Sequence, residues 1–535
     1  VAVNPKDMRY LSLIGKNVKI PIVNRTVKII ADHYADPEQG SGAVKITPAH
    51  DFNDYEVGKR NNLDIINIFE KNGKINKNGI KEFVGLDRFE ARKLLTKQLK
   101  ENGNLIKIET IQNKVPYGDR SNSIIEPLLT EQWFVDAKKL SKKPIKIVND
   151  SKTSFFPISW TKTFFQWMKN IEPWCISRQI WWGHRIPAWY DDNNNVFVAE
   201  NEKDAFNLAK KKNKNKKFKL KQETDVLDTW FSSALWPFAT LGWPVKTKEF
   251  LKFYPTSVLV TGFDIIFFWV ARMIIMGLDF MKEVPFKDIY IHPLVKDEKG
   301  QKMSKSKGNV IDPLELIKIY GADALRFTLA NLSTQGRDIK LSNKLVENSR
   351  NFLTKIWNVA RFSQFNNFKY DKSFLPESCK LSINKWILFK FFQTKKKVIK
   401  NLETYKFNLL ISELYHFIWN DFCDLYIELS KNYLKEDKNK HEISGVFNYV
   451  FSKSLNLINP IIPFITEKLG RELGYTKDSF YNELIDDDSK LTHQVKIIND
   501  FDNFINLVRK IRFEIGDSKS KFKLKIISEE KVKWI

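Results

Sequence analysis

The pattern of apolar and polar positions divides the chain into three regions. From residue 1 to about 118, short β-branched runs such as VKIPIV, TVKIIA and AVKITP alternate with turns, which is typical of strands. From about 156 to 310, predicted helices and strands are mixed and tryptophans are dense. From about 345 to 495, apolar residues recur at three- and four-residue spacing, which predicts a bundle of four or five helices. The pattern predicts an α/β multidomain protein with an all-α part.

Two stretches need their own interpretation. The most apolar run, Ile265–Met281, contains Arg272 and is short for a bilayer span, so we read it as a buried helix and predict no membrane association. The segment KKLSKKPIKIVNDSKTSFFP, residues 138–157, is rich in lysine, and we interpret it as an exposed linker with a basic face.

Composition narrows the class. At 535 residues the chain is too long for one core, and three or four domains are expected. The net charge of +25 favours a polyanionic partner, most simply nucleic acid, although a general bias toward Lys, Asn and Ile would also raise it. The cysteines, Cys175, Cys379 and Cys423, lie far apart, which excludes a disulfide framework and a CxxC zinc site and fits a reducing cytosol.

The stretch QKMSKSKGN carries the strongest chemical signal. Lys302, Lys305 and Lys307 surround Ser304, and three ammonium groups this close repel one another unless an anion lies among them. A β-branched and aromatic run precedes the stretch, and a helix capped by Asp312 follows it. The sequence therefore predicts a strand, a lysine loop for a polyphosphate and a helix, with a solvated lysine-rich turn as the alternative.

A second signal lies at Gly262 and Asp264, where the run SVLVT ends and a helix is predicted to begin. A strand that ends in glycine and an acidic residue before a helix is an arrangement of nucleotide sites, with the carboxylate reaching a ribose hydroxyl. Alone, this signal is weak.

A third signal lies in GSGAVKITPAHDFNDYEVGKRNN, where His50, Asp51, Asp54 and Glu56 fall within seven residues near a predicted helix start. The carboxylates could hold a substrate ammonium or orient a water. The alternative is that Asp51 or Asp54 simply caps the helix.

Two further stretches stay open from the residues alone. EPWCISRQIWWGHRIPAWY interleaves aromatics with arginine, which suits either a stacking surface for single-stranded nucleic acid or a packed aromatic core. The run Lys210–Lys217 has no apolar periodicity, and we interpret it as a disordered or surface insertion that touches RNA nonspecifically.

Taken in order, these motifs resemble the class I aminoacyl-tRNA synthetases of the valine, isoleucine and leucine subgroup. The resemblance covers nearly the whole chain and implies a Rossmann-like catalytic core, an inserted β-rich editing domain and an all-α anticodon-binding bundle. The implied domains are the C-terminal part of the editing domain at 1–118, a return linker at 119–155, the second half of the catalytic domain at 156–310, stem-contact helices at 311–344, the anticodon-binding bundle at 345–495 and the start of a C-terminal region at 496–535.

The resemblance also implies residue roles. Lys302 and Lys305 stabilise the pyrophosphate leaving group while ATP activates an amino acid, and Ser304 adds a hydroxyl donor. The residues implied for ATP binding are Gly262, Asp264, His292 and Lys305. Trp230 and Trp269 match positions that wall the amino-acid pocket, although core packing also explains two tryptophans.

For editing, the resemblance implies that Asp54, with Asp51 and His50 beside it, holds the amino group of a mischarged aminoacyl ester. Ser41 and Asn61 depart from the usual threonine and histidine, and we expect neither to abolish the pocket.

The family's HIGH motif and its threonine-rich editing loop have no match in the chain, and we expect both to precede Val1, so that this chain is a fragment. We predict that it forms no aminoacyl-adenylate as it stands.

The stretches PAHDFNDYEVGKR, DRSNSIIEPLLTEQWFV and DTWFSSALWPFATLGWP favour the valine-specific members over the isoleucine-specific ones. The implied partners are valine, ATP with Mg²⁺, and tRNA(Val), without a protein-bound zinc, for a cytoplasmic monomer. Two other functions stay open: a stand-alone editing hydrolase, and a basic RNA-binding module without catalysis.

Overall fold

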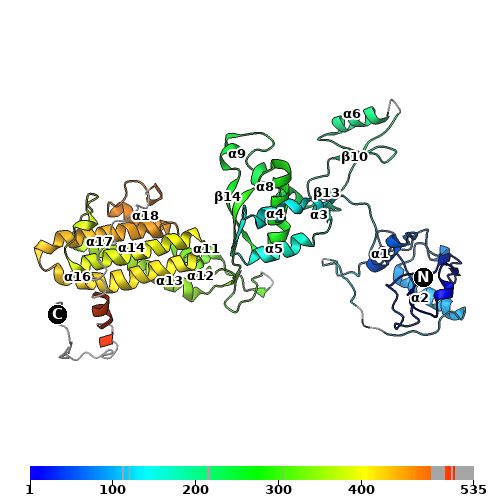
Figure 1. Ribbon diagram of the computed structural model, residues 1–535, viewed down its shortest axis with the longest axis horizontal. Helices are drawn as coiled ribbons and strands as arrows, with labels where there is room; N and C mark the ends of the chain where they lie inside the picture. Colours follow the sequence, from blue (N-terminus) through cyan, green and yellow to red (C-terminus); the bar gives the residue numbers. More distant parts are fainter. Residues whose placement is uncertain are drawn as a thin grey trace. The chain divides into compact units, whose positions relative to one another are not determined.

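The computed structural model describes residues 1–110, 112, 114–119, 121–213, 217–304, 307–482, 501–507 and 510–511. The chain divides into two compact units, Val1–Trp133 and Phe134–Ile535 (Figure 1). Each unit has its own hydrophobic contacts and is described separately.

Short strands organise the first unit. β1 (Ala2–Val3) lies between β4 (Ile30–Ala31), to which it is parallel, and β5 (Ala43–Val44), to which it is antiparallel. β2 (Asn17–Lys19) and β3 (Thr26–Lys28) form an antiparallel hairpin. Each predicted β-branched run therefore contains strand residues, but the strands are shorter than the runs.

Helices α1 (Phe52–Arg60) and α2 (Arg88–Glu101) complete the first unit. Each begins after an aspartate whose carboxylate accepts backbone N–H groups of the first turn, which satisfies donors that a helix start leaves free. The guanidinium of Arg60, at the end of α1, donates to both carboxylate oxygens of Asp32 at 2.9 and 2.8 Å, next to β4. This ion pair fixes α1 to the small sheet.

A parallel three-stranded sheet forms the centre of the second unit's α/β part (Figure 1). β15 (Phe286–His292) lies between β14 (Thr256–Gly262) and β7 (Ser154–Phe156), and is parallel to both. Ile289, Tyr290 and Ile291 are buried, as expected for a central strand covered on both faces.

The connection from β14 to β15 is the apolar run that the sequence predicted to be a buried helix, and that prediction is confirmed. It consists of a 3-10 turn η3 (Phe263–Ile265), a π-helix η4 (Ile266–Val270), α10 (Ala271–Met276) and a second π-helix η5 (Gly277–Met281). All six residues of α10 are buried. Among the described residues, no helix is long and apolar enough to cross a membrane.

The expectation of an exposed linker at residues 138–157 is wrong, because most of this stretch is helix or strand. That stretch forms α3 (Ala137–Leu140), α4 (Lys142–Asn149) and strand β7 of the central sheet. Val148 and Phe155 are 6% and 2% exposed. Lysines occupy the outer face of α4, and its inner face is apolar. The overall composition of the segment does not reveal this second face.

Smaller β-structures flank the sheet. They are β6 (Phe134–Val135) with β8 (Trp174–Cys175), β9 (Ser177–Arg178) with β13 (Val226–Leu227), β16 (Val295–Lys296) with β17 (Ile339–Lys340), and a three-stranded antiparallel sheet of β10 (Ala188–Tyr190), β11 (Val196–Val198) and β12 (Lys221–Gln222). Short helices lie between them: α5 (Trp160–Lys169), α7 (Thr229–Ser233), α8 (Trp236–Ala239) and α9 (Lys248–Phe253).

Helix α6 (Glu202–Asn213) covers the antiparallel sheet of β10, β11 and β12, and its Ala205 and Ala209 are buried against that sheet. The helix contains Lys210–Lys212, and all three are exposed, so of the two predicted alternatives these residues show a surface position and not disorder. The Lys212 ammonium lies 5.8 Å from the centre of the Phe197 ring. Residues 214–216 of the lysine run lie outside the described residues.

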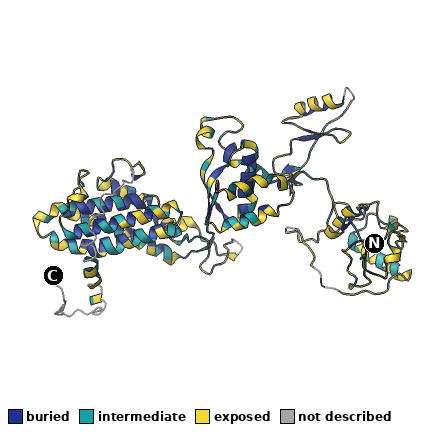
Figure 2. Ribbon diagram, in the orientation of Figure 1, coloured by how far each residue is buried: buried dark blue, intermediate teal, exposed yellow. Residues whose placement is uncertain are grey.

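The rest of the second unit is a helical bundle with the inner faces buried and the outer faces exposed (Figure 2). Its helical segments are α11 (Pro313–Tyr320), α12 (Ala322–Leu332), α13 (Asn343–Phe365), α14 (Ser382–Glu403), α15 (Phe407–His416), the π-helix η8 (Phe417–Ile427), α16 (Glu428–Tyr433), α17 (Asp437–Ile458) and α18 (Pro463–Glu472). Large aromatics such as Trp386, Phe391 and Phe447 fill its core. The predicted all-α part is confirmed.

Candidate functional site

The carboxyl edge of the parallel sheet brings three predicted ATP-binding residues together. Gly262, the last residue of β14, is the register partner of His292, the last residue of β15. A Cβ atom on Gly262 would lie 2.6 Å from Oδ1 of Asp264 and 3.7 Å from Cε1 of His292. A side chain at position 262 would therefore meet the Asp264 carboxylate, which would have to turn away from its present position. The carboxyl edge is where α/β sheets bind nucleotides.

The two polar side chains at this edge differ in their environment. Asp264 lies in the first turn of η3 and is exposed, so its carboxylate is accessible to a hydroxyl of a ligand. His292 is half-buried, and its Nδ1 lies 3.0 Å from the carbonyl oxygen of Pro293. If Nδ1 donates this hydrogen bond, Nε2 is left as an acceptor.

The chain passes from His292 directly into the lysine loop. β16 leads into a turn in which the Asp297 carbonyl accepts the Gly300 N–H at 2.9 Å, and Lys302 then forms an antiparallel bridge with Lys296. Gly300 has a φ of +79°, which favours glycine at this position. The lysine loop is thus carried by a hairpin that begins at Val295, three residues after His292.

One side chain ties this hairpin together. The amide of Asn309 donates to Oδ2 of Asp297 at 2.8 Å and to the Lys302 carbonyl at 3.3 Å, and its oxygen accepts the Ser304 N–H at 2.9 Å. The hydrogen bond from Asn309 is the main reason that the pKa of Asp297 lies below its usual range. Lys302 is exposed, and Lys305, the other predicted transition-state lysine, lies outside the described residues.

The two predicted pocket tryptophans lie on facing elements. Trp230 belongs to α7, and its ring stacks on that of Phe268 with centroids 5.7 Å apart. Trp269, next to Phe268 on η4, donates its indole N–H to the Ser233 carbonyl of α7 at 3.1 Å. Both tryptophans are half-buried, so each packs on one side and remains accessible on the other.

A charged cluster that the sequence did not reveal, with Asp228 and Arg272 buried and Arg178 partly exposed, lies next to the element that carries Trp230. Asp228, which caps α7, accepts the Trp174 indole N–H at 3.1 Å and pairs with Arg178 at 3.1 Å. Arg272, 5% exposed, lies over the Trp174 ring at 4.0 Å. Burial lowers the pKa of Arg272 to about 10, and the Asp228 carboxylate opposes that shift. A lone arginine in an apolar helix was the only signal in the sequence.

The aromatic and arginine segment contains both of the arrangements that the sequence left open. Trp174 and Trp189 are 9% and 5% exposed and belong to packed structure. Trp181 and Trp182 are fully exposed, at 104% and 92%. The first pair forms core, and the second pair is accessible for stacking on a partner.

In the first unit, Asp54 is part of a hydrogen-bonded chain. Its Oδ2 accepts the Thr47 backbone N–H at 2.7 Å and the Thr47 hydroxyl at 3.1 Å, and the Lys45 ammonium donates to that hydroxyl at 2.6 Å. Asp54 is 6% exposed. Sequence reasoning missed Lys45 and Thr47, which stand two residues apart on the strand-like run before the helix.

The other two predicted editing residues have structural contacts. Asp51 caps α1, because its Oδ1 accepts the N–H groups of Asn53 and Asp54 at 2.9 and 3.0 Å. His50 accepts the Ile68 N–H on Nε2 at 3.1 Å, and its Nδ1 lies 3.1 Å from the Pro127 carbonyl oxygen. A neutral ring protonated on Nδ1 satisfies both contacts, so His50 joins three segments of the unit.

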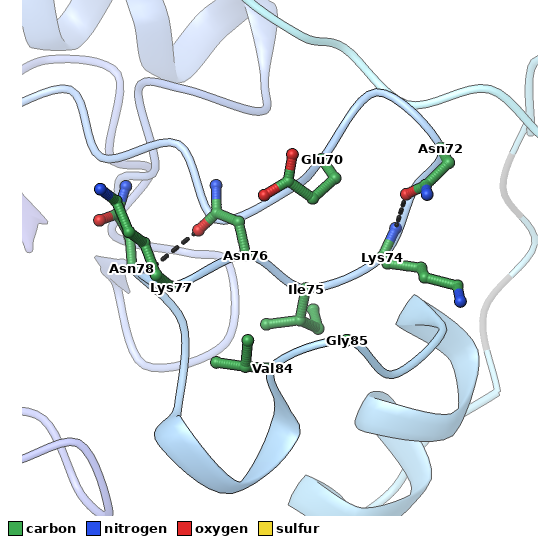
Figure 3. Close-up of a pocket in the computed structure, with 9 residues that line it drawn as sticks. All are labelled: Glu70, Asn72, Lys74, Ile75, Asn76, Lys77, Asn78, Val84 and Gly85. Atoms are coloured by element: carbon green, nitrogen blue, oxygen red, sulfur yellow. Dashed lines mark hydrogen bonds between the residues drawn. The ribbon is translucent and has the colours of Figure 1, made fainter.

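Figure 3 shows a pocket of about 340 Å³ elsewhere in the first unit. It is lined by Glu70, Asn72, Lys74, Ile75, Asn76, Lys77, Asn78, Val84 and Gly85. None of the predicted editing residues lines it. In the described part of the chain, no group of three His, Cys, Asp or Glu side chains has the geometry to hold a metal ion, and Cys175, Cys379 and Cys423 form no disulfide.

Comparison with known families identifies the class. Residues 6–342 match the tRNA synthetases class I (I, L, M and V), and residues 384–533 match the anticodon-binding domain of tRNA ligase. The chain therefore belongs to the class I tRNA synthetases, and the predicted fold class is confirmed.

Within that class, the relatives are valine–tRNA ligases. The one of Pelagibacter ubique is 60% identical over 471 residues, which are 88% of this chain and 54% of the relative. The one of Bartonella henselae is 48% identical over 540 residues, which are 96% and 59% of the two chains. The chain thus spans little more than half the length of these relatives.

Solved structures agree at the level of the fold. The chain matches the ternary complex of Agrobacterium radiobacter K84 agnB2 LeuRS with tRNA and LeuAMS with a TM-score of 0.51 at 15% identity, over 98% of this chain and 66% of the other. It matches Mycobacterium tuberculosis methionyl-tRNA synthetase bound by methionyl-adenylate with a TM-score of 0.50 at 16% identity, over 66% and 65%.

Proposed function

We propose that this chain is the part of a valine–tRNA ligase that supports ATP-dependent activation of valine and its transfer to tRNA(Val), with hydrolytic editing of Thr-tRNA(Val). The observation that carries the proposal is the meeting of Gly262, Asp264 and His292 at the carboxyl edge of the parallel sheet. The hairpin of the lysine loop begins three residues after His292. The identity of 48–60% to valine–tRNA ligases supports the choice of amino acid.

In the proposed activation step, the valine carboxylate attacks the α-phosphate of ATP and pyrophosphate leaves. In this proposal the Asp264 carboxylate accepts a hydrogen bond from a ribose hydroxyl of ATP, and His292 contacts the adenine. Lys302 and Lys305 approach the leaving pyrophosphate and stabilise the charge that develops there, with Ser304 as a further donor. Mg²⁺ enters with ATP, and we assign it no protein ligand.

The proposed amino-acid pocket lies at Trp230 and Trp269. Two indoles held by Phe268 and the Ser233 carbonyl set a fixed width, which excludes larger side chains. Threonine has nearly the shape of valine, and an apolar pocket rejects an added hydroxyl only about a hundredfold, a limit known from valine-specific enzymes themselves. A second, hydrolytic site is therefore needed.

We propose that this second site is built on the chain Lys45, Thr47 and Asp54. A carboxylate suits the ammonium of a mischarged aminoacyl ester, while a hydroxyl and an ammonium suit its hydroxyl groups. We keep Asp51 and His50 at the site as positioning residues, since one begins α1 and the other holds the segments around it.

For tRNA, we propose that the helical bundle binds the anticodon arm and that Trp181 and Trp182 stack on unpaired bases of the 3′ end. Their full exposure beside a strongly basic composition supports this role. We further propose a cytoplasmic monomer, as the family resemblance implies.

Binding of tRNA by the purified chain tests the proposal. We expect unmodified tRNA(Val) to bind more tightly than tRNA(Ile) in fluorescence anisotropy at fixed salt, since phosphate contacts alone give no such preference. Equal affinities for both would overturn valine specificity.

A stand-alone editing hydrolase is the second candidate, because the Lys45, Thr47 and Asp54 chain lies in a compact unit of its own. Incubation with Thr-tRNA(Val) separates the two. Rapid deacylation by the first unit alone, abolished by Asp54→Ala, favours the hydrolase. The ligase assignment predicts that the chain binds tRNA through its second unit, so that deleting that unit abolishes binding.

A further inference from the structure

The turn between α14 and α15 connects the helical bundle to the parallel sheet of β14, β15 and β7. Its central residue, Tyr405, extends away from the bundle, and its hydroxyl donates to Oδ2 of Asp288 on β15 at 2.7 Å. Its ring lies 4.8 Å from that of Phe156 on β7 and 5.7 Å from that of Tyr290 on β15, measured between centroids. One side chain thus contacts two of the three strands of the sheet.

The backbone of the same turn holds a second element. The side-chain amide of Gln335 donates to the carbonyl oxygens of Thr404 and Tyr405 at 3.2 and 3.4 Å. Gln335 lies four residues before β17, which pairs with β16, the strand that leads into the lysine loop. A second line of contacts therefore runs from the turn to the lysine loop.

Tyr405 adopts an unusual backbone conformation for these contacts. Its φ of +55° is in the left-handed region, which costs a non-glycine residue free energy and persists only where the surroundings enforce it. Burial, together with the hydrogen bond to Asp288, raises the pKa of the phenol to about 12, so the hydroxyl keeps its proton and remains a donor.

From these contacts we infer that Tyr405 is a positioning residue, through which the helical bundle sets the position of the β15 carboxyl end and of the lysine loop. Both lines of contacts start at the turn between α14 and α15. The first runs through Asp288 along β15 to His292, four residues further on. The second runs through β17 to β16, the strand just before Asp297. A ligand that shifts the bundle would move both halves of the proposed ATP site together. This coupling rests on the proposed function only for the identity of the ligands.

Hydrogen exchange of the purified chain tests the inference without any ligand. Tyr405→Phe removes the hydroxyl and keeps the ring, and we expect the amides at the end of β15 and in the lysine-loop hairpin to exchange about tenfold faster, as for loss of one hydrogen bond to a charged acceptor. Tyr405→Ala also removes the ring contacts and should accelerate the same amides further.

The matched control is Tyr426→Phe, which removes a similar hydrogen bond, to Oδ1 of Asn384 at 2.9 Å, entirely inside the bundle. We expect Tyr426→Phe to speed the exchange of amides in the bundle. Amides of β15 should exchange faster only as far as the variant lowers the stability of the whole unit. Unchanged β15 exchange in both Tyr405 variants, or a change that Tyr426→Phe reproduces, would overturn the inference.

A second arm adds transfer RNA. Saturating tRNA(Val) should slow exchange at β15 and the lysine loop in the wild-type chain and not in Tyr405→Ala, measured at equal occupancy. Slowing that survives in Tyr405→Ala would overturn the coupling. RNA that fails to bind the wild-type chain would count against the proposed function, while the ligand-free comparison still decides the role of Tyr405.

Discussion

The Asn309 side chain gives the sharpest prediction about the lysine loop. It makes three hydrogen bonds across the hairpin, to Asp297, to the Lys302 carbonyl and from the Ser304 N–H. Asn309 is half-buried, so water replaces part of what is lost, and we take the lower half of the usual range, about 0.5–1 kcal/mol for each bond. Asn309→Ala should then cost about 2 kcal/mol of loop closure, which opens the loop roughly thirtyfold more often.

Asn309→Asp distinguishes this account from a simple size effect. The new carboxylate would face Asp297 where the amide now donates at 2.8 Å, and like charges at that distance repel. Although aspartate is nearly the same size as asparagine, we expect Asn309→Asp to open the loop more than Asn309→Ala at pH 7.

The two proteins should also respond to pH in opposite directions. In the wild-type chain the pKa of Asp297 is lowered, so loop closure is complete above the ordinary aspartate pKa and is lost as the pH falls through the lower, folded value. In Asn309→Asp the paired carboxylates raise each other's pKa, so closure is regained as the pH falls.

The assay is hydrogen exchange of the Lys307 backbone amide, reported as its protection factor. This amide donates to the Ser304 carbonyl at 3.2 Å, and no variant changes either residue. Asn72→Ala serves as the control, since the Asn72 side chain accepts one backbone N–H in the other unit. Protection in Asn309→Asp equal to or above that of Asn309→Ala at pH 7 would refute the reasoning, as would parallel pH profiles.

Three further predictions follow from other parts of the chain. Gly445→Ala should destabilise the bundle by about 1–3 kcal/mol in thermal unfolding, because its Cβ would lie 2.4 Å from the Phe374 ring, and Phe374→Leu in the same chain should recover part of the loss. Asp32, whose pKa Arg60 lowers through two hydrogen bonds, should give the first unit stability that is present above the ordinary aspartate pKa and lost at lower pH; acid unfolding of Asp32→Asn should lack that component, and an unchanged profile would contradict it. Finally, the chain as it stands should show no valine-dependent pyrophosphate exchange, because it contains no HIGH motif, and measurable exchange would disprove this.

Local signals in the sequence predicted the sheet edge well. The β-branched run before Gly262 and the apolar residues before His292 predicted two strands, and glycine followed by an acidic residue marks where one of them ends. The helical bundle could be predicted equally well from the sequence, because apolar spacing of three and four residues over a whole helix such as α14 fits a helix and no strand. What these signals could not give was the pairing of Gly262 with His292, which depends on strand register.

Contacts between distant residues explain what the sequence did not reveal. Phe155 belongs to the central sheet, yet it follows a lysine-rich stretch whose apolar positions are few. The Asp54 carboxylate finds Thr47 only when α1 folds back on the preceding run, and Arg272 is tolerated in the core because Trp174 covers it and Asp228 lies nearby. None of these partners is marked by spacing or composition.

The central claim is that the lysine loop and the sheet edge together bind the polyphosphate of ATP, and competitive acetylation of lysines tests it most directly. The purified chain would be labelled with a trace acylating reagent, with and without millimolar pyrophosphate or ATP, and each lysine quantified by mass spectrometry. We predict that Lys302, Lys305 and Lys307 become several-fold less reactive, that Lys369 in the bundle does not change, and that Asn309→Asp weakens the protection. Equal reactivity of the three loop lysines with and without nucleotide, or protection confined to lysines outside the loop, would contradict the account.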